Sequence, residues 1–188
     1  MSQRSVVAVL TLLAIMLAAG IVHVASLLIV PRVAPDDAFA RLAAVTPEGT
    51  LTMLPRAGSR DAVLPGGDPS MASAVCRYDL DRGALRVVAP LRGDAFVALT
   101  LHSRSGLAFY GLTDRSGNED RLELVVMTAR QFEEAKARDA VETPAHDVRV
   151  VAPQPRGFVM VDMLPRVGGD AETRRALSAV SCRVERPS

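Results

Sequence analysis

The sequence has no tryptophan, two tyrosines and a single lysine, Lys136, among its 22 basic residues. Aromatic residues make up only 4% of the chain, too few for the stacking platform that single-stranded nucleic acids need. The 22 basic and 21 acidic residues nearly cancel, to a net charge of +1, so no basic stripe is available for a duplex. Nucleic acid is therefore not expected as a partner.

Motifs of common catalytic chemistry are also missing. There is no Gly-x-Ser-x-Gly elbow, and the neighbours His102 and Ser103 would point to opposite faces of a strand. The glycine pairs at 66–67 and 168–169 lack the following lysine or helix pattern of a phosphate loop. His146-Asp147 has no further His or Cys neighbour to complete a zinc site. We expect no catalytic residue, no cofactor and no metal ion.

What the sequence does have is a long apolar run near its N-terminus. Residues 5–30 contain no Asp, Glu, Lys or Arg, and these 26 residues exceed the roughly 20 that a spanning helix needs. Pro31 ends the run, and Arg32 marks the return to water. A cleaved signal peptide, with Ala18-Ala19-Gly20 as its cleavage site, is the competing interpretation. We favour an uncleaved anchor in the bilayer, because the apolar residues continue well beyond that site.

The charges around the run do not decide its orientation by themselves. Arg4 precedes it, while Arg32 and Arg41 follow it. A tail of four residues before the run and a long domain after it are typical of a signal anchor with a cytoplasmic tail. We therefore expect a single-pass protein of the inner (cytoplasmic) membrane, with its C-terminal domain in the periplasm.

His23 lies inside the apolar run. An ionisable residue at that depth is costly and is a candidate for contact with a partner helix or a lipid headgroup. The alternative is a neutral imidazole near the membrane interface with no function.

The rest of the chain divides into a connector at residues 31–69 and a β-rich domain at residues 70–188. The connector starts with a short amphipathic helix at 36–45, capped by Asp36 or Asp37, and continues through a stretch rich in proline and glycine. Short apolar segments separated by turn signals predict strands in the domain. These segments are 74–80, 85–88, 95–102, 107–112, 122–127, 148–151 and 158–164.

Two helices are predicted among the strands. Residues 131–138 have the composition of a solvated surface helix, whereas residues 170–184 place Leu177, Val180 and Val184 on one face. The predicted fold is therefore mainly β, an antiparallel sandwich or a barrel-like form with a C-terminal helix, preceded by one N-terminal transmembrane helix.

The stretch Val75 to Val87 resembles the strand–turn–strand element of a bacterial membrane-protein family, the domain-of-unknown-function family numbered twelve-fifty-four. Residues 111–115 with 121–126 are similar to its next block, and residues 20–23 with 28–32 to the anchor of its short, single-span members. The resemblance covers most of the chain. It implies a membrane protein with a β-rich domain and no established enzyme class, and, by analogy, a second small membrane protein as partner.

The polar loop at 113–121 lies between two apolar segments and is the most suggestive surface. We take Thr113, Asp114 and Arg115 as the candidate binding residues. Calcium binding would need acids at every second position and a distant glutamate, a pattern from which this loop departs. A solvated hairpin loop is the plain alternative.

Cys76 and Cys182 are the only two cysteines, and both fall in the domain expected in the periplasm. Disulfides persist there, so we predict a bond joining the first confident strand to the C-terminal helix. Two reduced, buried thiols are the alternative.

Two functions remain open. One is an envelope interaction or binding module that recognises a partner, and the other is a small-ligand binder or enzyme using a cleft of the β domain. A filled interior would favour the first, and an open apolar pocket with a few convergent polar groups the second.

Overall fold

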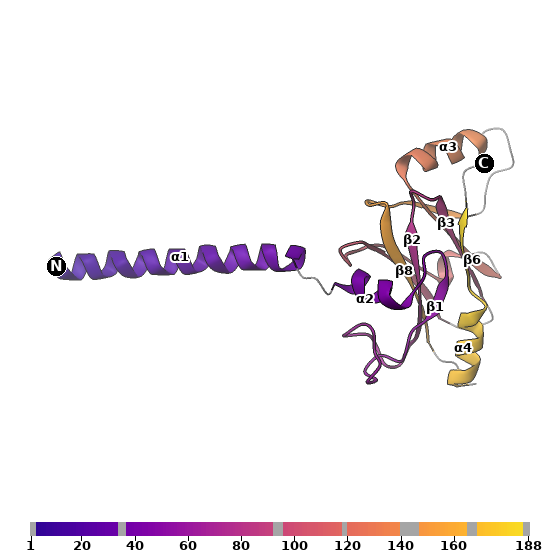
Figure 1. Ribbon diagram of the computed structural model, residues 1–188, viewed down its shortest axis with the longest axis horizontal. Coiled ribbons are helices and arrows are strands. Elements are labelled where there is room, and N and C mark those ends of the chain that lie inside the picture. The colour runs from indigo at the N-terminus through magenta and orange to yellow at the C-terminus, as the bar shows by residue number, and fades with distance from the viewer. Residues whose placement is uncertain are drawn as a thin grey trace. The chain divides into compact units, whose positions relative to one another are not determined.

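The computed structural model describes residues 3–33, 37–91, 96–117, 120–139, 147–164 and 169–185, and its chain forms two compact units, Met1–Pro35 and Asp36–Ser188. The first unit contains one 31-residue helix, α1 (Gln3–Val33) (Figure 1). Residues 3–30 of this helix are long and apolar enough to cross a membrane, although a signal sequence would meet the same test. His23 lies on α1 with its side chain exposed.

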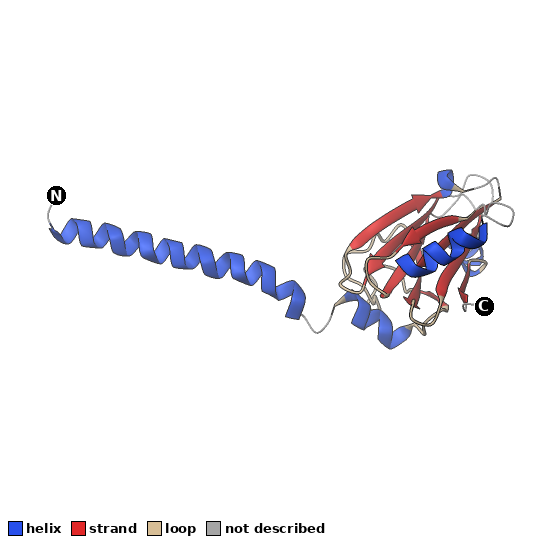
Figure 2. Ribbon diagram, turned by 90° about the horizontal axis from the view of Figure 1, so that it is seen from above, coloured by secondary structure: helices blue, strands red, loops and turns tan. Residues whose placement is uncertain are grey.

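The described residues of the second unit form nine strands in two sheets (Figures 1 and 2). The first sheet has the order β1-β2-β8-β4-β5 and is antiparallel throughout. Its strands are β1 (Leu51–Met53), β2 (Ala72–Asp79), β8 (Arg156–Met163), β4 (Val97–Ser103) and β5 (Ala108–Thr113). The second sheet has the order β7-β6-β3-β9. Its strands are β7 (Val148–Val151), β6 (Arg121–Met127), β3 (Ala84–Pro90) and β9 (Ser181–Glu185).

The core lies between the two sheets because the inward side chains of both are apolar. On β3 the buried residues are Leu85, Val87 and Ala89, and on β4 they follow the same alternation. Apart from Ser103 at the end of β4, all of them belong to a single apolar cluster. A fully buried leucine or valine contributes roughly 1.5–3 kcal/mol, so this filled interior supplies most of the stability of the sandwich.

The second sheet differs from the prediction of a purely antiparallel sandwich, because β6 and β7 pair in parallel. Parallel neighbours need a crossover connection of a dozen or more residues rather than a tight turn. The segment from Met127 to Val148 provides it and includes α3 (Ala129–Asp139). Of the two predicted forms, a sandwich or a barrel-like fold, the described residues show two sheets, and the prediction that all strands pair antiparallel was wrong for β7.

The predicted C-terminal helix over 170–184 is wrong. A shorter helix, α4 (Asp170–Ser178), ends before β9, which pairs with β3 in antiparallel register. Leu177 and Val180 are buried as expected, but Val184 lies in register with Leu85 on the sheet. The open edge of β3 provides hydrogen-bond partners for the backbone of residues 181–185. This pairing outweighs the helical pattern, which rests on only three apolar residues.

On either side of β1, the chain packs on the outer face of the first sheet, the face turned away from the core. The helix α2 (Ala38–Val45) begins at Asp37, whose carboxylate accepts a hydrogen bond from the Ala40 amide at 2.7 Å. A second apolar cluster joins this segment to the sheet. Its buried members are Phe39, Leu42, Leu54, Val75 and Phe158.

Candidate functional site

Cys76 and Cys182 form a disulfide, as predicted, with their Cα atoms 6.5 Å apart. Cys76 lies on β2 of the first sheet and Cys182 on β9 of the second, so the bond crosses the sandwich from sheet to sheet. The prediction that Cys182 lies on a helix was wrong, for the reason given for β9. The bond is structural, because Cys76 is completely buried.

A groove of about 440 Å³ runs over the outer face of the first sheet. Its floor is formed by side chains of β2, β8 and β4, and its rim by α2 and residues 54–71. The floor residues are Ser73, Thr100, His102, Phe158, Met160 and Asp162. The groove combines an apolar body with a few polar groups, which is the usual composition of a ligand site.

Strand alternation places these floor residues on the outer face. On β8, Val159, Val161 and Met163 point into the core, so Met160 and Asp162 must point out. The antiparallel register then brings Asp162 opposite Ser73 on β2. The alternation of side chains on β8 and β2, together with the register between these strands, therefore creates the polar end of the groove.

Asp162 is the acidic group on the groove floor. Its Oδ1 accepts a hydrogen bond from the Ser73 hydroxyl at 2.5 Å. Burial raises the pKa of this carboxyl, while the Ser73 bond and the nearby His102 oppose that rise. Among the residues that the structure describes, no arginine or lysine forms an ion pair with it. A partly buried carboxylate that is not paired with an arginine or lysine favours a positively charged ligand.

His102 occupies the other end of the polar floor. Its ring stacks on Phe158, and its Nδ1 lies 3.0 Å from the carbonyl oxygen of Gly106. In a serine hydrolase the histidine sits between the serine and the acid. Here Ser73 bonds directly to Asp162, so the three residues are not a catalytic triad.

Two arginines from the first sheet and its loops hold α2 at the rim of the groove by contacts with Phe39. We call Phe39, Arg77 and Arg104 the α2 clamp. The guanidinium groups of Arg77 and Arg104 each lie over the Phe39 ring, 4.7 Å from its centroid. Arg77 also donates to the Thr46 carbonyl at 2.9 Å, and Arg104 pairs with Asp37 at 3.0 Å. The Arg104 pair holds the start of α2 and the Arg77 bond holds its C-terminal end, and the helix supplies Ala38 and Arg41 to the rim.

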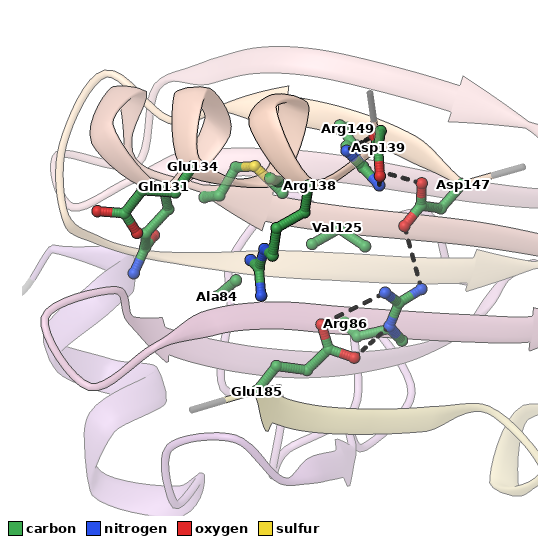
Figure 3. A pocket seen from close by; sticks show the side chains of 12 residues that line it. Ala84, Arg86, Val125, Gln131, Glu134, Arg138, Asp139, Asp147, Arg149 and Glu185 are labelled. Atoms are coloured by element: carbon green, nitrogen blue, oxygen red, sulfur yellow. Dashed lines mark hydrogen bonds and ion pairs between the residues drawn. The ribbon is translucent and has the colours of Figure 1, made fainter. Parts of the chain in front are cut away.

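A second hollow, of about 240 Å³, lies on the outer face of the second sheet beneath α3 (Figure 3). Figure 3 shows Arg86 joined to Asp147 and Glu185, and Arg149 pairs with Asp139 and Asp147. Burial alone would lower the pKa of Arg86, but its carboxylate neighbours raise it. Because these groups already neutralise one another, the hollow offers less to a ligand than the groove does.

The predicted site residues lie near the groove but do not line it. Thr113 ends β5 in register with Ala98, which is itself in register with Asp162. Two strand spacings, about 10 Å, therefore separate the Thr113 and Asp162 backbones. Asp114 and Arg115 belong to the short 3-10 helix η1 (Asp114–Ser116), with Arg115 exposed.

Some of the other candidates considered from the sequence lie outside the described residues. They are Asn118 and Glu119 of the polar loop, His146, and Gly168. Within the described ranges, no group of three or more His, Cys, Asp or Glu side chains is arranged to hold a metal ion.

Sequence reasoning missed Ser73, Thr100 and Asp162. A signal for Asp162 existed, because Val159-Met160-Val161-Asp162-Met163 puts one acid on the alternate face of an apolar strand. The pairing of Asp162 with Ser73 links residues 89 positions apart, and no local pattern shows it.

Known proteins resemble this chain in fold alone. No family model and no curated protein matches the sequence. The crystal structure of the VPA0106 protein from Vibrio parahaemolyticus aligns with a TM-score of 0.56 at 11% identity, over 81% of this chain and 37% of that one. A putative uncharacterized protein from Burkholderia cenocepacia aligns with a TM-score of 0.41 at 14% identity, over 71% and 35%. This chain thus spans little more than a third of either solved structure, and the first likeness shows that its fold recurs inside a longer protein.

Proposed function

We propose that this protein is a membrane-anchored binding module and that the groove on the outer face of the first sheet is its binding surface. The groove carries the proposal, because it is concave, largely apolar and equipped with convergent polar groups. The sandwich interior cannot serve, since buried side chains fill it.

The proposed location is the inner (cytoplasmic) membrane, with α1 as an uncleaved anchor and the β domain in the periplasm. The length and apolar surface of α1 support the anchor. The Cys76–Cys182 bond supports the periplasm, because disulfides persist in oxidising compartments and are rare in the cytosol.

A protein partner at the edge of the first sheet is a second candidate. In the described part of the chain β5 is an end strand of that sheet, and Leu107 and Tyr110 are 71% and 43% exposed. Such an edge offers unpaired backbone groups to a strand of another chain. The proposed partner is a second small membrane protein, by analogy with the family that the sequence resembles.

The groove is tested by filling it. Full-length wild type and Met160→Trp are purified from gently solubilised membranes, and the co-purifying small molecules and proteins are identified. Val151→Trp is the matched control, because Val151 is an exposed residue on the second sheet. We expect a small molecule that co-purifies with wild type and with Val151→Trp but not with Met160→Trp. A ligand retained equally by all three would place the binding site elsewhere.

The location is tested with a reporter. Alkaline phosphatase fused after Ser188 should be active in whole cells, because that enzyme folds only after export. A cytoplasmic reporter at the same position should be inactive. The reverse pattern would place the domain in the cytoplasm.

A further inference from the structure

The groove has one acidic group set among apolar side chains. Met160 and Phe158 form the floor beside Asp162, and apolar residues of the 54–71 segment face them from the rim. The rim residues are Leu54, Pro55, Val63, Leu64 and Met71. A ligand that fits must offer an apolar body to most of this surface and one polar group to Asp162.

Asp162 has binding capacity left over. The Ser73 hydroxyl occupies Oδ1, and a carboxylate can accept about four hydrogen bonds in total. The other titratable or charged groups around the groove are His102 on β4, Asp68 in the connector and Arg41 on α2. Asp68 is already engaged by Ser70, and Arg41 also makes an interaction of its own.

We propose that the groove binds a small molecule with an apolar body and a protonated amine, and that Asp162 recognises the amine. This inference rests on the proposed function of the groove. An ammonium group neutralises the carboxylate where water solvates it poorly, whereas a neutral or anionic head would leave that charge unpaired. His102 also lies on this floor, where its Nδ1 donates to the Gly106 carbonyl oxygen.

Three probes with the same apolar body test the class of ligand. They are 4-phenylbutylamine, 4-phenylbutan-1-ol and 4-phenylbutyrate, titrated calorimetrically into the full-length protein in lipid nanodiscs, with empty nanodiscs to subtract partitioning. We expect the amine to bind about tenfold or more tightly than the alcohol, which is typical of a hydrogen bond to a charged group. The butyrate should bind most weakly of the three.

Asp162→Asn is the decisive variant, because it removes the charge and keeps an oxygen for the Ser73 hydroxyl. It should lose most of the preference for the amine and keep the affinity for the alcohol. Asp81→Asn, which changes an exposed carboxylate in the turn after β2, is the matched control and should behave like wild type.

The pH dependence gives an independent test on the unmodified protein, and it holds even if Asp162→Asn fails to fold. Protonation of Asp162 removes the charge that the amine pairs with, so amine binding should weaken as pH falls through the raised pKa of this carboxyl. Binding of the alcohol should change little. Equal binding of amine and alcohol would overturn the amine assignment and leave the groove as a binding site. Failure of all three probes to bind would overturn both proposals.

Discussion

The ring of His102 lies flat on the ring of Phe158, with centroids 4.7 Å apart and planes within 3° of parallel. The two residues are direct neighbours in the register of β4 and β8. The stack and the contact with the Gly106 carbonyl hold the imidazole in one orientation. Because a carbonyl only accepts hydrogen bonds, Nδ1 of this ring carries a proton and donates it to the Gly106 oxygen. The floor of the groove is therefore preorganised at this position.

Two variants separate the contributions of this histidine. His102→Phe keeps an aromatic ring over Phe158 and loses the bond to Gly106, which should cost about 1 kcal/mol of unfolding free energy. His102→Ala loses the stack as well, at a further cost of about 0.5–1.5 kcal/mol. Urea unfolding of the full-length protein in detergent measures both. If the alanine variant were as stable as the phenylalanine variant, the stack would contribute nothing.

Asp162 should lower stability at neutral pH. Its pKa in the folded protein is raised by burial, so the folded state prefers the protonated carboxyl. The protonated Asp162 therefore stabilises the folded state fully at pH values below the ordinary pKa of an aspartate. This stabilisation is lost as the pH rises through the raised pKa of Asp162 in the folded protein. Asp162→Asn should melt at a higher temperature than wild type at pH 7, and the gap should close in acid. A variant that melts lower at pH 7 would contradict this.

The strands were the most predictable part of the fold. Leu85, Val87 and Ala89 on β3, like the inward residues of β4, alternate with residues that face outward, and a period of two identifies such strands from the sequence. The end of the chain misled the same reasoning, because Leu177, Val180 and Val184 are also spaced for a helix. What decides that segment is the open edge of β3, nearly a hundred residues earlier in the chain.

The groove was out of reach of the sequence for a related reason. Its floor comes from three strands that are consecutive in the sheet but not in the chain, and its rim comes from a proline- and glycine-rich segment. Only the register of β2, β8 and β4 brings Ser73, Thr100 and Asp162 to one place. A polar residue on the outer face of a strand is otherwise ordinary.

The α2 clamp predicts unequal effects for its two arginines. Arg77 is buried and bonded to the Thr46 carbonyl, so Arg77→Ala should cost about 1.5–3 kcal/mol. Arg104 is largely exposed, and Arg104→Ala should cost about 0–1 kcal/mol. Phe39→Ala should cost about 3–5 kcal/mol, because it also empties the cluster beneath α2. Thermal or urea unfolding ranks the three, and equal losses at both arginines would contradict the role assigned to burial.

Asp114 and Arg115 remain the predicted partner-binding residues at the end of β5. No ion pair joins either of them to another residue of the described chain, so replacement should change stability by less than about 0.5 kcal/mol. Asp114→Ala and Arg115→Ala should each reduce recovery of the partner membrane protein in affinity purification, at an unchanged melting temperature. Unfolding or poor expression of both variants would instead make them structural residues.

Reduction of the Cys76–Cys182 bond should strongly lower the free energy of unfolding. The two residues are 106 positions apart, and chain-entropy reasoning assigns about 4–5 kcal/mol to a loop of that length. Reduction of the wild type keeps both sulfur atoms in place, so it avoids the cavity that alanine would leave at the buried Cys76. Dithiothreitol should therefore lower the urea midpoint of wild type strongly, and should leave that of a Cys76→Ala/Cys182→Ala variant unchanged.

The same bond also bears on location, because its formation in the cell requires an oxidising compartment. Native membranes are treated with an alkylating agent before any reductant, digested, and analysed by mass spectrometry. We expect a single linked peptide pair containing Cys76 and Cys182, since β2 and β9 hold their Cα atoms within bonding range. Recovery of both cysteines in alkylated form would show reduced thiols in the cell. That result would remove the bond from the fold and with it the main support for a periplasmic domain.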